Sequence, residues 1–107
     1  MSRLFSLLFL ILSLSIYSQS TKELIDNLNS INNHQKKAEL CREIALRLQN
    51  SDWDRAIKYI ELAEVEAKNA QVPESILADV YITAGKMYSS KEVLDIALQY
   101  YLKAYDI

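Results

Sequence analysis

The sequence is poor in the residues that interrupt regular structure. Its 107 residues include one glycine, Gly85, one proline, Pro73, and one cysteine, Cys41. Tight hairpin turns need glycine or similar residues at special backbone positions, so hairpins are scarce and an all-α chain is favoured. A single cysteine excludes an intrachain disulfide. The length allows one small domain at most.

The chain also lacks an excess of positive charge. Twelve Lys and Arg residues stand against 14 Asp and Glu residues, for a formal net charge of −2 and a pI of about 5.3. Nucleic-acid binding needs a basic face, so this balance argues against a nucleic-acid partner.

Residue patterns that carry chemistry are scarce too. No Gly-rich phosphate loop, nucleophile turn or metal-binding helix motif occurs. His34 is the only histidine and is expected on a surface loop, while Cys41 is expected as a buried structural thiol. Helix capping and the helix dipole explain Asp52 and Asp54 better than a catalytic acid pair. We therefore expect no enzyme activity, no cofactor and no metal.

Residues 1–20 have the layout of a secretory signal peptide. Arg3 precedes an apolar run from Leu4 to Ile16, and small polar residues follow up to Ser20. The run is shorter than the roughly 20 apolar residues of a spanning helix. Cleavage after Ser18 or Ser20 would leave a small residue at the cut; the alternative is an uncleaved N-terminal membrane anchor. The layout predicts an exported protein of the periplasm or cell envelope, with membrane contact only through this segment or one further downstream.

From Thr21 onward, apolar residues recur with helical spacing. A short helix is expected within residues 21–33, followed by four helices in residues 34–107. Ser51 or Asp52 is expected to cap the third helix, and Pro73 to occupy the first position of the fourth. Ser89 and Glu92 have capping-box spacing for the fifth.

Two helix pairs share one pattern. The second pair has the sequence Ala78-x2-Tyr81-x2-Ala84-Gly85-x2-Tyr88-x8-Ala97-x3-Tyr101-x2-Ala104, and the first repeats the skeleton with Ala38, Cys41, Ile44, Ala45, Leu48, Ala56, Ile60 and Ala63. The pattern resembles the tetratricopeptide repeat, with repeats at residues 38–70 and 73–107. The repeats are 40 residues apart, from Ala38 to Ala78, against about 34 in the family. We expect the third helix to be extended by the excess.

The resemblance implies antiparallel helix pairs stacked as a short right-handed solenoid. Small residues let the helices of a pair approach, and large ones fill the gaps beside them. The residues expected to do this are Ala45, Ala56, Ala63, Tyr81, Gly85, Tyr88, Ala97, Tyr101 and Ala104. Glycine inside a helix costs about 1 kcal/mol against alanine, so close packing is the expected reason for Gly85, which should face the partner helix near Ala97.

The resemblance also implies a binding face. The first helix of each family repeat lines a concave groove that takes up a protein or peptide segment. The corresponding residues are Glu39, Arg42, Leu46, Gln49, Asp79, Ile82, Lys86 and Ser89. They are mixed in charge and lack the basic carboxylate clamp of chaperone-binding members, so a merely solvated face is the alternative.

At the level of function, the sequence predicts an exported protein-interaction scaffold. A looser resemblance is to the N-terminal sensing regions of bacterial membrane-bound histidine kinases and transcription regulators, which implies a part of a larger signalling protein. The alternative is an independent small helical structural protein of the envelope. The last helix carries Ile96, Leu98, Tyr101, Leu102, Tyr105 and Ile107. An apolar patch there is expected to meet further repeats, or to make the isolated chain marginally stable or self-associating.

Overall fold

The computed structural model describes residues 20–107, and the expected signal segment lies outside them except for Ser20. The described part is all-α, as predicted, and contains no strand. Its helices are α2 (Thr21–Leu28), α3 (His34–Leu48), α4 (Trp53–Ala67), α5 (Glu74–Ser90) and α6 (Leu94–Tyr105). None of these helices is long and apolar enough to cross a membrane.

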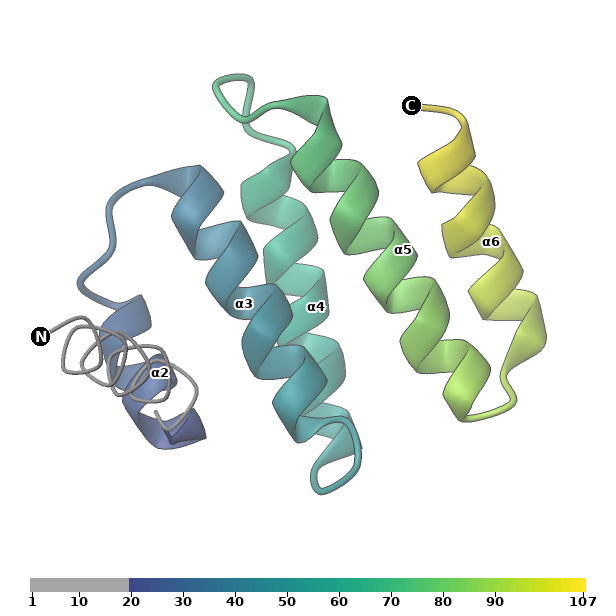
Figure 1. Cartoon of the computed structure of the whole chain (residues 1–107), viewed down its shortest axis with the longest axis horizontal. Helices are drawn as coiled ribbons and strands as arrows, with labels where there is room; N and C mark the ends of the chain where they lie inside the picture. Colours follow the sequence, from purple (N-terminus) through teal and green to yellow (C-terminus); the bar gives the residue numbers. More distant parts are fainter. Residues whose placement is uncertain (1–19) are drawn as a thin grey trace, which may run out of the picture.

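Consecutive helices run in opposite directions, and α3 to α6 lie side by side with α2 at one edge (Figure 1). α3 packs on α4, and α5 packs on α6. α5 also contacts both α3 and α4, so it joins the two pairs. Within the described chain, α2 packs only on α3, and α6 only on α5. Among the described helices, α6 therefore has one neighbour.

The core lies where α3, α4 and α5 meet. Its largest fully buried side chains are Ile44, Ile60, Met87, Val80 and Cys41. Fully buried alanines at the α3–α4 contact, Ala38, Ala45, Ala56 and Ala63, let the two backbones come close. Of the other expected packing residues, Tyr81, Gly85 and Ala97 are buried, Tyr88 and Ala104 are half-buried, and Tyr101 is exposed.

Side-chain caps fix three helix starts. The side chain of Ser20 accepts a hydrogen bond from the Glu23 N–H (3.1 Å), and that of Asn33 accepts from the Lys36 N–H (3.0 Å). Asp52, not Ser51, caps α4 by accepting from the Arg55 N–H (3.2 Å). This confirms one of the two expected caps for this helix.

The expected extension of the third helix is wrong. α4 ends at Ala67, and the residues in excess of the family length form the connection to α5. Asn69 stabilises a turn in this connection with two hydrogen bonds. Its side chain accepts one from the Gln71 N–H (3.0 Å), and its carbonyl accepts one from the Val72 N–H (2.9 Å). Such local bonds compete with a further helical turn. Pro73 is the N-cap of α5, with extended ψ of 141°, rather than its first helical residue.

The capping box expected at the fifth helix is also wrong. Ser89 lies inside α5, and α6 begins only at Leu94, after an N-cap, Val93, that makes no side-chain bond. Glu92 has a left-handed φ of 61°, which reverses the chain while the Val93 N–H donates to the Tyr88 carbonyl (3.0 Å). The chain therefore leaves α5 through a left-handed turn of the kind that commonly ends helices.

Candidate protein-interaction faces

The eight residues expected to line a groove lie on α3, its C-cap and α5. Glu39, Asp79 and Lys86 are exposed, and Ile82 is the large apolar side chain exposed among them. The Arg42 guanidinium donates to the Thr83 hydroxyl at 3.4 Å, which joins α3 to α5 across this side of the molecule. Leu46, Gln49 and Ser89 are half-buried. We call this surface the α3–α5 face.

The α3–α5 face is suited to polar contacts. Each helix offers one carboxylate and one cation, Glu39 with Arg42 and Asp79 with Lys86, so the face has no strong charge of either sign. Leu46 is partly drawn into the core. The hollows found in the described part are lined by other residues. A groove on this face therefore stays a prediction.

The outer side of α6 is the most apolar surface in the described chain. Its exposed apolar side chains are Leu94, Leu98, Tyr101, Leu102 and Tyr105, with exposures between 37 % and 87 %, followed by Ile107 just past the helix. Ile96, expected in this patch, is half-buried, whereas Leu94 was missed. Leu94 precedes Leu98 by four residues, and this helical spacing is the signal in the sequence that places it in the patch. We call the five residues of the helix the α6 end face.

Gly85 sets the position of one member of this face. A Cβ atom at Gly85 would lie 2.6 Å from Cε1 of Tyr101 and 2.8 Å from its Cδ1. The tyrosine ring therefore lies directly on the backbone of α5. From the sequence, Gly85 was expected to face its partner helix near Ala97. In the structure Gly85 contacts Tyr101, one turn further along α6. The ring buries one side on α5 and leaves the other in solvent.

An aromatic cluster lies on another side of α6, where the helix faces α5, and it continues from α5 to Trp53 of α4. The rings of Tyr88 and Tyr100 stack at 5.7 Å, Trp53 meets Tyr88 edge-on at 5.3 Å, and Tyr81 lies 6.1 Å from Tyr100. Burial raises the pKa of Tyr100 to about 12. The cluster ties the three helices together, since aromatic pairs add to the free energy of area burial.

Two lysines cover this cluster. The Lys103 ammonium lies 5.1 Å from the ring centre of Tyr100 and 5.6 Å from that of Tyr81. The Lys91 ammonium lies 5.4 Å from the ring of Trp53. These are cation–π distances. Both cations are thereby held on the aromatic side of α6, away from the α6 end face.

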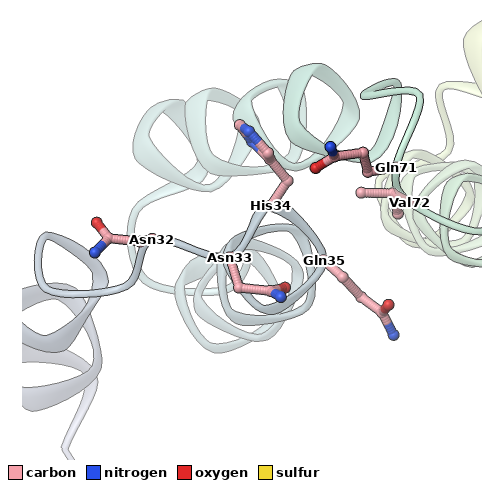
Figure 2. Close-up of a pocket in the computed structure, with 6 residues that line it drawn as sticks. All are labelled: Asn32, Asn33, His34, Gln35, Gln71 and Val72. Carbon is pink, nitrogen blue, oxygen red and sulfur yellow. The ribbon is translucent and has the colours of Figure 1, made fainter.

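A polar hollow of about 190 Å³ lies between the α2–α3 and α4–α5 connections (Figure 2). It is lined by Asn32, Asn33, His34, Gln35, Gln71 and Val72. His34 is the first residue of α3 rather than a loop residue, and its Nδ1 donates to Oε2 of Glu66 at 2.5 Å. The His34–Glu66 bond links the start of α3 to the end of α4, and Asn33 caps α3. Both of these polar side chains of the hollow thus have a structural role.

Cys41 borders a second hollow, of about 240 Å³, beneath α2. The thiol is buried, as predicted. Burial raises its pKa to about 11, with a further increase from the nearby Glu66 and an opposing effect of Lys37. The thiolate is the nucleophilic form of cysteine, so a buried thiol with a raised pKa is expected to react slowly at neutral pH.

We predict that iodoacetamide does not alkylate Cys41 in the folded protein at pH 8 but does so in urea. Stability should also fall as the pH rises from about 9 towards about 11, because the unfolded thiol then loses its proton while the folded one keeps it. Mass spectrometry after timed labelling checks the first statement. Rapid labelling without denaturant would contradict the burial of this thiol.

Comparisons with known proteins assign no family to the chain. No protein-family model matches it, and neither a curated protein nor a solved structure does so. In residues 20–107, no three His, Cys, Asp or Glu side chains are grouped so that they could hold a metal ion.

Proposed function

We propose that this chain is an exported protein-interaction scaffold made of tetratricopeptide-like helix pairs. The observation that carries the proposal is the way the pairs join, with α5 contacting both helices of the preceding pair. In stacked repeats each unit buries its apolar face on the next, and the first helices of successive units form a shared surface. The α3–α5 contact through Arg42 and Thr83 is consistent with that layout.

The surfaces support the same proposal. The polar α3–α5 face and the apolar α6 end face both present exposed side chains along a helix, and helical repeat proteins bind along extended surfaces of this kind. Export and membership of a larger signalling protein rest on the sequence of residues 1–20 and on the looser family resemblance. A short right-handed solenoid is the arrangement we propose for the stack.

Photo-crosslinking in the cells that produce the protein tests the proposal. A photoreactive residue replaces Glu39 on the α3–α5 face or Leu102 on the α6 end face, both exposed. The matched control replaces Lys58, which is exposed on α4. We expect discrete adducts of defined mass from Glu39 or Leu102 and none from Lys58. No adduct from either test position would instead favour a purely structural role.

A further inference from the structure

The α6 end face has the spacing of a helix-packing seam. Leu94, Leu98, Tyr101 and Tyr105 follow one another at intervals of four, three and four residues, the a and d spacing of a heptad. Leu102 widens the seam on one side. Ile82 of α5 lies on the other side of the seam and is exposed. It is one helical turn before Gly85, which contacts the Tyr101 ring.

No described helix covers this seam, because α6 packs on α5 alone. Large contiguous apolar patches are uncommon on monomeric proteins and mark interaction sites. The seam spacing favours a second helix as the covering element, since knobs at a and d positions fit between the side chains of a facing helix.

The rim of the seam is acidic. Asp95 precedes Leu98 by three residues and Asp106 follows Leu102 by four, so both carboxylates lie beside the apolar side chains. Both are exposed, and neither has an ion-pair partner within residues 20–107. The nearest cations along the chain, Lys91 and Lys103, lie over the aromatic rings on the other side.

On α5 the charges beside Ile82 balance. Asp79 precedes it by three residues and Lys86 follows it by four, and both are exposed. The excess charge beside the seam is therefore negative, and it is carried by Asp95 and Asp106 of α6. A second copy docked antiparallel, with Leu98 against Tyr101, would bring Asp95 of each copy close to Asp106 of the other. Like charges at such an interface are unfavourable, so self-pairing does not fit the rim.

We propose that the α6 end face binds an amphipathic helix of another protein, with apolar residues at heptad spacing and Lys or Arg residues beside them. The apolar stripe would fill the seam, and the basic flanks would meet Asp95 and Asp106. This inference rests on the proposed scaffold function and names the surface and the partner chemistry.

Synthetic peptides of about 14 residues, two heptads, provide the probe. One carries Leu at a and d with Lys and Gln elsewhere, the second has Glu in place of every Lys, and the third is a scrambled form of the first. Fluorescence anisotropy at low ionic strength measures binding to the purified protein. We expect the Lys peptide to bind about tenfold or more tightly than the Glu peptide, with the preference weakening in salt, and the scrambled peptide to bind least.

Variants locate the site and test the charge argument. Leu98→Ser should weaken binding of the Lys peptide by about tenfold. The matched control Leu62→Ser, at an exposed leucine of α4, should leave it unchanged. The double variant Asp95→Lys/Asp106→Lys should prefer the Glu peptide. Circular dichroism verifies that each variant is folded.

The proposal is overturned if neither peptide binds, if both bind equally, or if the double variant keeps the original preference. It is also overturned if sedimentation equilibrium shows a dimer of the free protein that Leu98→Ser dissociates, since a second copy would then be the occupant. A discrete crosslink from Glu39 in cells, together with any of these results, would leave the scaffold function standing and reject this partner.

Discussion

Replacing Gly85 by leucine should lower the free energy of unfolding by about 3 kcal/mol through overpacking. A side chain at this position must enter the space of the Tyr101 ring, which lies closer than any Cβ contact allows. Among the described helices α6 packs only on α5, so displacing the ring loosens the one helix contact that holds α6 within residues 20–107. Urea denaturation followed by circular dichroism measures the loss. An unchanged midpoint would reject the packing role of Gly85.

Alanine at the same position gives a finer test. Alanine favours the helix by about 1 kcal/mol over glycine, but its Cβ would still lie 2.6 Å from Cε1 of Tyr101. We expect Gly85→Ala to be neutral or destabilising in the native chain, and to stabilise by about 0.5–1 kcal/mol when Tyr101→Ala has removed the ring. If the two substitutions are additive, the ring and the glycine are not in contact.

Replacing Met87 by alanine should cost about 2–5 kcal/mol, the usual range for a buried Met. Its side chain is fully buried in the core. Val80, Thr83 and Met87 lie on one face of α5, because they are three and four residues apart. Thr83 contacts Arg42 of α3, so this face is directed towards the α3–α4 pair. The cavity would therefore open between the two pairs.

The control for this variant is Met87→Leu, which keeps the volume and should cost less than about 1.5 kcal/mol. Trp53 fluorescence reports on the α4–α5 contact, since its ring packs against Tyr88, and circular dichroism reports on all helices. The two signals should give one coincident unfolding transition. A loss below about 1 kcal/mol for Met87→Ala, or two separate transitions, would mean that the pairs do not share one core.

Periodicity and composition predicted the all-α class and the buried stripes. Cys41, Ile44 and Ala45 recur at helical spacing, and each is buried in the structure. The Asp52 cap was also predictable, because a capping side chain acts on backbone groups only three residues away. Such local effects are encoded in a few neighbouring residues.

Other features depend on contacts between distant residues or on competing local bonds. The start of α6 was misplaced because Ser89 and Glu92 fit a capping box, while α5 continued through Ser90 and turned at Glu92 instead. The contact of Gly85 with Tyr101 requires the register of two helices. Lys91 and Lys103 lie over aromatic rings instead of beside Asp95 and Asp106. This placement depends on where three rings lie in the folded protein, which no spacing in the sequence reveals.

Amide hydrogen exchange with and without the Lys-flanked peptide tests most directly whether this is a scaffold whose α6 helix receives a partner. In the free protein, α6 should exchange faster than α3 and α4, because it packs on only one other helix within residues 20–107. With the peptide bound, exchange should slow in α6 and in the Ile82–Gly85 part of α5, while α3 and α4 stay unchanged. Slowing centred on α4, or no slowing in α6, would contradict the account.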